Sequence, residues 1–120
     1  MREGDFQFDF ERLIVYQKAL NFIDKIFEVY KKLPRDLKYP LGDNMIRAAL
    51  SVANNIAEGN GKISKKEKNR YFGISLDSTR ECISVLNVFK RQSLVDEEKY
   101  TELRRDGREI TNMTHGLINS

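Results

Sequence analysis

The chain has 120 residues, which we interpret as one domain (residues 1–120) of a size that can bury a core. Its 21 Lys and Arg against 18 Asp and Glu give a net charge of +3, which permits a nucleic-acid partner without requiring one. A single cysteine excludes an internal disulfide framework, and no apolar stretch approaches the ~18 residues that would span a membrane. Without a basic-then-apolar signal at the N-terminus, these features predict a cytoplasmic protein.

The first predicted helix spans residues 10–33. We expect Asp9 to cap it and Phe8 to pack against Leu13. Two overlapping heptad-like rows of apolar residues merge into an arc of roughly 150°, wider than the ~100° that a surface helix needs. Loops could cover such an arc, but we favour burial on two sides, partly against other copies of the chain. The residues expected at this oligomer interface are Val15, Phe22 and Ile26.

Three further helices are predicted after a proline-containing loop over residues 34–41, and they span residues 43–59, 64–92 and 96–118. Gly59 and Gly61 are expected to end the first of these, while Ser64 and Asp96 cap the other two. The helix over 64–92 also carries surplus apolar surface, which again favours self-association. No segment alternates with the period of a strand. The short connections therefore predict an all-α fold, an antiparallel up-down-up-down four-helix bundle.

A polar stripe without lysine follows the helix over 43–59. If this helix and the next form an antiparallel hairpin, the numbers of facing positions add up to about 129. That register pairs Arg47 with Glu81, Ser51 with Ser78, Asn54 with Ser75, and Glu58 with Arg70 or Tyr71. We favour a structural role, as a seam that fixes the register of the two helices or as an oligomer contact, over a binding site. The residues of this seam are Arg47, Ser51, Asn54, Glu58 and Glu81.

The residue types that carry most enzyme chemistry are scarce. His115 and Cys82 are the only histidine and cysteine, they fall on different predicted helices, and no set of residues has the spacing of metal ligands. The run from Gly59 to Ser64 lacks the spacing of a phosphate loop. We therefore expect no catalytic residues, no metal and no cofactor, and a protein that is not an enzyme.

Basic residues gather in three places, one of which is the loop after the first helix, with Lys31, Lys32, Arg35 and Lys38. A second cluster surrounds the turn between the second and third helices, and it includes lysines in the first turn of a helix, where positive charge opposes the macrodipole. Three arginines lie on the last helix. In an oligomer each cluster would repeat around the symmetry axis, which favours binding of phosphates; ordinary solubilising charge is the alternative. The candidate nucleic-acid-binding residues are Lys62, Lys65, Lys66, Lys68, Arg70, Arg104, Arg105 and Arg108.

The order of motifs resembles a known family. The run from Leu13 to Leu20, the pair Leu33-Pro34, the segment from Arg47 to Gly59, and the elements at 64–67 and 78–81 look like the 23S rRNA intervening-sequence proteins of bacteria. This resemblance implies a left-handed four-helix bundle that assembles into a ring-shaped homopentamer, without established catalytic residues. The family is also similar to the accessory variability determinant proteins of diversity-generating retroelements, which partner a reverse transcriptase and nucleic acid.

These observations predict a non-enzymatic, self-associating helical bundle that binds RNA or a ribonucleoprotein through basic clusters repeated around a ring. The alternative is a protein-interaction scaffold that recruits a reverse transcriptase or another protein partner. We expect no membrane partner.

Overall fold

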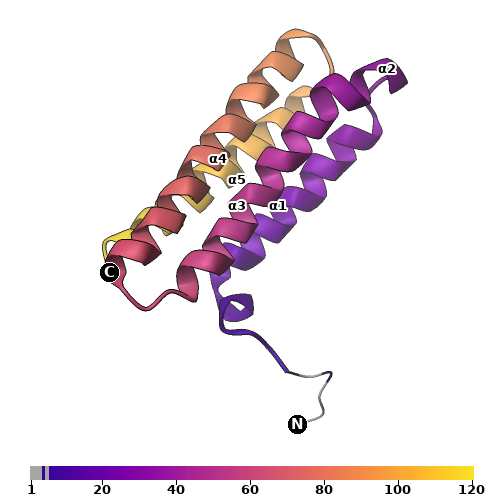
Figure 1. Ribbon diagram of the computed structural model, residues 1–120. Helices are drawn as coiled ribbons and strands as arrows, with labels where there is room; N and C mark the ends of the chain where they lie inside the picture. Colours follow the sequence, from indigo (N-terminus) through magenta and orange to yellow (C-terminus); the bar gives the residue numbers. More distant parts are fainter. Residues whose placement is uncertain (1–3, 5) are drawn as a thin grey trace.

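The computed structural model describes residues 4 and 6–120, and Figure 1 shows that these residues form an elongated bundle of helices. Within them lie four long helices and no strand: α1 (Ile14–Lys31), α3 (Asp43–Asn60), α4 (Lys65–Arg91) and α5 (Glu97–Ile118). The prediction of an all-α fold is confirmed. The bounds agree with the predicted ones within a few residues, because each long helix has an apolar row of helical period that packs into one core.

Each long helix packs against two others, in the cyclic order α1, α3, α4, α5 (Figure 1). The contacts between neighbours set their directions. Ser51 of α3 meets Ser78 of α4, with 2.7 Å between the hydroxyl oxygens, in the register that the sequence predicts. Tyr30, near the end of α1, packs against Gly42 at the start of α3. These contacts place the middles of α3 and α4 side by side and the end of α1 beside the start of α3.

The predicted loop over residues 34–41 is instead largely helical. It contains the short helix α2 (Arg35–Leu37) and a π-helical turn, η3 (Lys38–Gly42), which runs directly into α3. The helix α1 ends at Lys31, shortly before Pro34, as the proline predicts. Pro34 itself lies at the N-cap of α2. The two turns bring the chain back across the end of the bundle without an extended connection.

The start of the first helix was predicted wrongly. The helix α1 begins at Ile14, and Asp9 instead begins a separate 3-10 turn, η2 (Asp9–Arg12). The Asp9 carboxylate accepts a hydrogen bond of 2.6 Å from the side-chain amide of Asn60, at the end of α3. A tertiary partner thus takes the oxygen that would cap the helix. The other two capping predictions are confirmed, because the side chains of Ser64 and Asp96 accept bonds from the backbone of the first turns of α4 and α5.

The three residues expected at an oligomer interface lie in the core of the single chain, so that assignment was wrong. Val15, Phe22 and Ile26 expose 3%, 1% and 0% of their surface, respectively. The wide apolar arc of α1 is real, but these residues form its inner edge. Its outer edge carries Leu20 and Phe27, which are exposed. The sequence period places both edges on one helix, and only the neighbouring helices decide which edge is covered.

Gly59 serves packing rather than helix termination. The helix α3 continues to Asn60, and Gly61 caps it with an ordinary right-handed backbone (φ −85°) instead of the left-handed conformation that favours glycine. A Cβ atom on Gly59 would lie 2.7 Å from a ring carbon of Phe72. The absence of a side chain therefore allows α3 and the start of α4 to approach closely.

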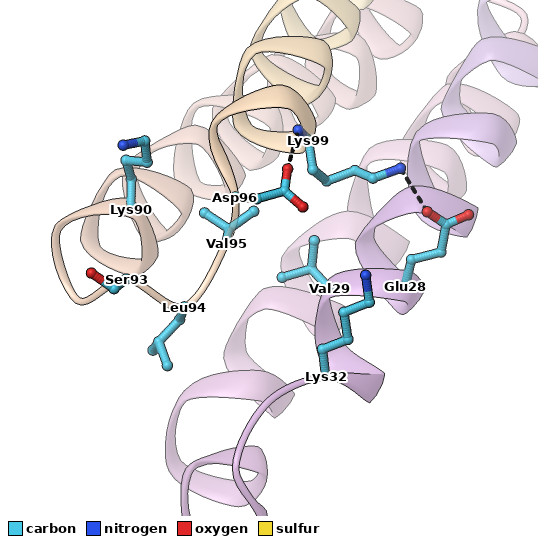
Figure 2. A pocket seen from close by; sticks show the side chains of 9 residues that line it. All are labelled: Glu28, Val29, Lys32, Lys90, Ser93, Leu94, Val95, Asp96 and Lys99. Atoms are coloured by element: carbon cyan, nitrogen blue, oxygen red, sulfur yellow. Dashed lines mark hydrogen bonds and ion pairs between the residues drawn. The ribbon is translucent and has the colours of Figure 1, made fainter.

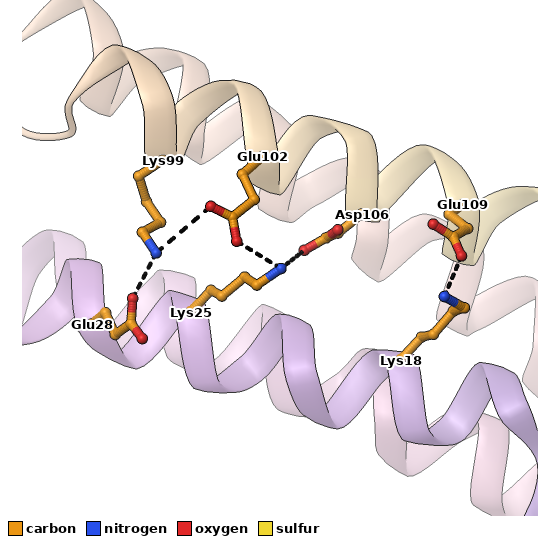
Figure 3. Close-up of polar contacts among 7 residues, drawn as sticks. All are labelled: Lys18, Lys25, Glu28, Lys99, Glu102, Asp106 and Glu109. Atoms are coloured by element: carbon orange, nitrogen blue, oxygen red, sulfur yellow. Dashed lines mark hydrogen bonds and ion pairs between the residues drawn. The ribbon is translucent and has the colours of Figure 1, made fainter.

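A ladder of ion pairs joins α1 to α5 along one edge of the bundle, as Figure 3 shows. Lys25 lies 2.6 Å from Asp106 and 2.8 Å from Glu102, and Lys99 lies 2.6 Å from Glu28. A further pair joins Lys18 to Glu109. The hydrogen bonds that Lys25 donates to Asp106 and, with a smaller effect, to Glu102 raise the pKa of Lys25, and the bond from Lys25 lowers the pKa of Glu102. Most carboxylates of α5 therefore face α1 and are already partnered.

Candidate nucleic-acid interface

The predicted basic cluster surrounds the connection between α3 and α4, and we call its five residues the basic turn: Lys62, Lys65, Lys66, Lys68 and Arg70. Three of them have local partners. Lys62 lies 5.1 Å above the ring of Tyr71, and Arg70 lies 4.5 Å above the same ring. Lys68 is half-buried and donates to the carbonyl of Asn60, where it satisfies the end of α3. These contacts hold their positive charges at fixed places.

Lys65 and Lys66 are the two exposed lysines of the basic turn. Both are exposed, and neither forms an ion pair among residues 6–120. They occupy the first turn of α4, where the helix dipole disfavours positive charge. Their position therefore does not help the helix, and as exposed residues they are accessible to a phosphate.

The three arginines predicted on the last helix do not form one cluster. Arg104 and Arg108 line a groove between α4 and α5, whereas Arg105 lines a separate hollow together with Glu97, Glu98, Glu102 and Asp106. Successive residues of a helix are rotated by about 100°, so Arg105 faces the carboxylates and not the groove. Of the three, Arg105 is thus the least available to an anion.

The groove between α4 and α5 has a volume of about 370 Å³, and we call it the arginine groove. It contains a third arginine, Arg80 of α4, which was not among the predicted binding residues. Its floor is Gly107, and no carboxylate lines it. Guanidinium groups and hydroxyls are the groups that bind phosphate oxygens. The lining residues are Thr79, Arg80, Ile83, Ser84, Asn87, Arg104, Gly107, Arg108 and Thr111.

Arg104 is held in the arginine groove by neighbours on both helices. Its guanidinium donates to the side-chain oxygen of Asn87 at 3.0 Å and lies 5.5 Å above the ring of Tyr100. The Tyr100 hydroxyl donates to the same Asn87 oxygen at 2.8 Å. This network orients the arginine with a neutral partner, so its charge stays available to a ligand. Arg80 and Asn87 lie seven residues apart on one face of α4, and pairing that face with α5 could have revealed them.

The predicted polar seam exists in part. Ser51 and Ser78 meet as expected, and Asn55, which was not predicted, donates to the Ser51 hydroxyl at 3.0 Å. Ser75 donates to the backbone carbonyl of Val52 and not to Asn54. The longer members, Arg47, Asn54, Glu58 and Glu81, are exposed, and Glu58 approaches Lys62 at 3.8 Å instead of Arg70. Short hydroxyl and amide side chains make the seam, since long ones reach solvent.

A second pocket, of about 390 Å³, lies between the end of α1 and the connection from α4 to α5 (Figure 2). Its apolar wall is Val29, Leu94 and Val95, and three lysines stand around it: Lys32, Lys90 and Lys99. Lys99 pairs with Glu28 and Lys90 with Glu97 at 2.8 Å. The opening thus combines an apolar patch with partly neutralised positive charge.

The lone cysteine and histidine lie apart from these surfaces. Cys82 is buried, and desolvation raises the pKa of its thiol to about 12, so it is an unreactive core residue. His115 is exposed near the end of α5. Among the residues that the structure describes, no group of three or more His, Cys, Asp or Glu is placed to hold a metal ion, and no helix is long and apolar enough to cross a membrane.

The comparisons with known proteins agree with this architecture. The sequence matches the family of 23S rRNA-intervening sequence proteins over residues 11–116. The fold is similar to the crystal structure of a protein of unknown function from the S23 ribosomal protein family of Bacteroides thetaiotaomicron. The TM-score is 0.82, with 23% identity over 89% of this chain and 100% of that one. No curated protein matches. Since the family match spans both basic regions and all four long helices, this chain belongs to the 23S rRNA-intervening sequence protein family.

Proposed function

We propose that this protein is a non-enzymatic, cytoplasmic RNA-binding protein that contacts phosphates through the arginine groove and the basic turn. The observation that carries this proposal is the sorting of charge around α5. Its carboxylates Glu102, Asp106 and Glu109 pair with lysines of α1, whereas Arg104 and Arg108 on another side of the helix line a groove without carboxylates. Although the net charge is only +3, positive charge therefore gathers at the arginine groove.

The geometry suits a phosphate backbone. Arg104 and Arg108 are one helical turn apart, about 6 Å along α5, and Arg80 faces them from α4. Separate phosphates of one strand can thus meet separate guanidinium groups. The family is named for sequences that intervene in 23S rRNA, which favours RNA as the nucleic acid.

We further propose that the chain self-associates into a ring-shaped homo-oligomer, with five copies and left-handed bundles as the family resemblance implies. Support comes from apolar side chains on the outer sides of α1 and α3. Leu20, Phe27 and Leu50 expose 41%, 36% and 42% of their surface, and the antiparallel register places them on one face. A ring would repeat the arginine groove around its axis, and each repeat adds phosphate contacts.

The test is binding of the purified protein to a structured RNA and to single-stranded DNA, measured by fluorescence anisotropy at 50 and 200 mM salt. We expect affinity that falls steeply with salt. The double variant Arg80→Ser with Arg108→Ser should weaken binding and make the logarithmic salt slope shallower, by about 0.7–0.9 for each phosphate that is no longer neutralised. Arg105→Ser is the matched control for each single variant, Arg80→Ser or Arg108→Ser, because it also removes one positive charge, but from the carboxylate-lined side of α5.

A second variant separates the two basic regions. Lys65→Glu with Lys66→Glu reverses two charges that have no ion-pair partner among residues 6–120, so the fold should not change. Weaker binding by an unchanged oligomer would support the basic turn as a contact. Absence of any binding at 50 mM salt would refute the nucleic-acid proposal.

A protein scaffold, which recruits a reverse transcriptase or another protein, is the second candidate. The observation that favours it is the pocket of Figure 2, where apolar Val29, Leu94 and Val95 lie beside Lys32 and Lys90. Such a surface fits an acidic peptide with an apolar anchor. Val95→Asp with Lys32→Glu should abolish capture of such a partner without changing RNA binding, which a pull-down paired with the anisotropy assay would show.

A further inference from the structure

A row of aromatic rings continues from the bundle into the N-terminal segment, and we call it the aromatic row: Phe6, Phe8, Phe10 and Tyr16. The ring of Phe10 meets Tyr16 of α1 edge-on, with 5.0 Å between centroids. Phe8 stacks on Phe10 at 5.9 Å, with an angle of 18° between the rings. Phe6 meets Phe8 edge-on at 5.3 Å. Each ring thus holds the next one.

The outer half of the row faces solvent. Phe6 and Phe8 expose 60% and 59% of their surface, although phenylalanine is among the residues that folding usually buries. The segment is nevertheless fixed to the bundle. The backbone N–H of Phe8 donates to the Glu11 carboxylate at 2.8 Å, and Asn60 donates to Asp9. Two large apolar rings are therefore presented to solvent at a defined place.

The base of the aromatic row lies at the same end of the bundle as the basic turn. Figure 1 shows the N-terminal segment at the same end of the bundle as the connection from α3 to α4. A hollow of about 490 Å³ links the two, and its lining includes Phe10, Tyr16 and Lys62. Its two carboxylates are occupied, because Asp9 accepts from Asn60 and Glu58 approaches Lys62. Lys65 and Lys66 follow Lys62 in the chain, in the first turn of α4, and have no ion-pair partners in residues 6–120.

Exposed aromatic rings beside positive charge form the surface that binds single-stranded nucleic acid, since bases stack on the rings while cations hold the backbone. A duplex keeps the faces of its bases stacked inside and offers only phosphates and base edges, so it has no open base face for a ring. We propose that Phe6 and Phe8 stack with unpaired bases of a single strand whose phosphates contact the basic turn. This inference rests on the proposed nucleic-acid binding and adds its substrate class, unpaired nucleotides rather than duplex.

The chain contains no tryptophan, so Phe8→Trp gives a single fluorescent reporter in the row. The probes are a single-stranded DNA of 12 nucleotides, an abasic strand of equal length and charge, and a duplex of the same sequence. We expect the base-bearing strand to quench the tryptophan, and the abasic strand and duplex to leave its emission nearly unchanged. Quenching by the abasic strand to the same extent would overturn the inference.

Affinity gives an independent measurement. Phe6→Ala with Phe8→Ala should weaken binding of the base-bearing strand by at least about fivefold, the loss expected from one stacked base. Binding of the abasic strand should not change. Ile14→Ala is the matched control, because Ile14 is also apolar and 60% exposed but lies outside the row. Circular dichroism checks that the helices are retained, as expected for exposed positions.

The outcomes separate this inference from the proposed function. If the abasic strand and duplex bind with steep salt dependence and the double alanine variant binds the base-bearing strand like wild type, phosphate binding stands and the stacking role is refuted. If no probe binds at 50 mM salt, both proposals fail. If the double variant instead lowers the oligomer mass in sedimentation and leaves strand affinity unchanged, the rings contact a second copy, which also overturns the inference.

Discussion

Substitution of Gly59 by alanine tests whether close helix packing, rather than helix termination, requires glycine at this position. The residue is buried within α3. An added Cβ would lie 2.7 and 2.8 Å from two ring carbons of Phe72 and 3.1 Å from the backbone oxygen of Lys68. Real Cβ atoms do not approach other atoms so closely, so either the ring or the helix must move.

The expected free energy combines two opposing effects. Alanine is favoured over glycine inside a helix by about 1 kcal/mol. Overpacking of a well-packed core costs about 1–3 kcal/mol. The Phe72 ring is only 3% exposed, so any movement must displace core neighbours, and the Lys68 oxygen belongs to the backbone. We therefore expect an overpacking cost in the upper part of its range, which the helix preference of alanine reduces to a net destabilisation of about 1–2 kcal/mol.

Urea denaturation followed by circular dichroism measures this difference. Gly73→Ala is the matched control, because a Cβ there meets nothing within 4 Å and should stabilise α4 by up to about 1 kcal/mol. The effects of substitutions at Gly59 and Phe72 should also be coupled. When Phe72→Leu is added to Gly59→Ala, it should recover part of the stability that Gly59→Ala removes. If Gly59→Ala is as stabilising as Gly73→Ala, the contact with Phe72 does not constrain this position and the argument is refuted.

Three further predictions concern stability and reactivity. Ser93 is a non-glycine residue with φ of 59° after α4, and its backbone is held by the 2.8 Å bond from Leu94 to Phe89. Ser93→Gly should therefore stabilise the fold by about 0.5–1 kcal/mol in urea, whereas Ser93→Ala should not. The Cys82 thiol, with its pKa raised by burial to about 12, should react with a thiol reagent at pH 8 only after unfolding, and rapid native labelling would contradict its burial. Because Lys25 lowers the pKa of Glu102, that carboxylate stabilises the folded state above its unfolded pKa and loses this effect as the pH falls. Lys25→Met should thus lose less stability than wild type between about pH 7 and pH 3, and an equal loss would argue against this pairing.

The sequence alone predicted the elements because the forces that form them are local. The apolar period and the capping residues Ser64 and Asp96 located three helices within a residue or two. The meeting of Ser51 and Ser78 followed from the length of the turn between two antiparallel helices. The start of the first helix did not follow, because Asp9 prefers the Asn60 amide, a partner from a distant part of the chain, to the local backbone.

The sequence did not determine which edge of the apolar arc of α1 is buried. The sequence determined that the arc is wide, yet Phe22 lies in the core while Phe27 of the same helix is exposed. Both residues are large and apolar, and each has apolar neighbours at helical spacing. Which edge is covered depends on where α3 and α5 pack, and that depends on the fit of all four helices at once.

The candidate site divides in the same way. The positive charges of the basic turn were evident from the sequence, because neighbours in a short turn remain neighbours in space. The arginine groove was not evident, since Arg80 and Arg108 belong to different helices and meet only through the register of α4 against α5. The sequence thus determined the helices and the charged side chains that each of them carries. Tertiary packing decided which charges face one another and which are neutralised, because side chains far apart along the chain come together only when the helices pack.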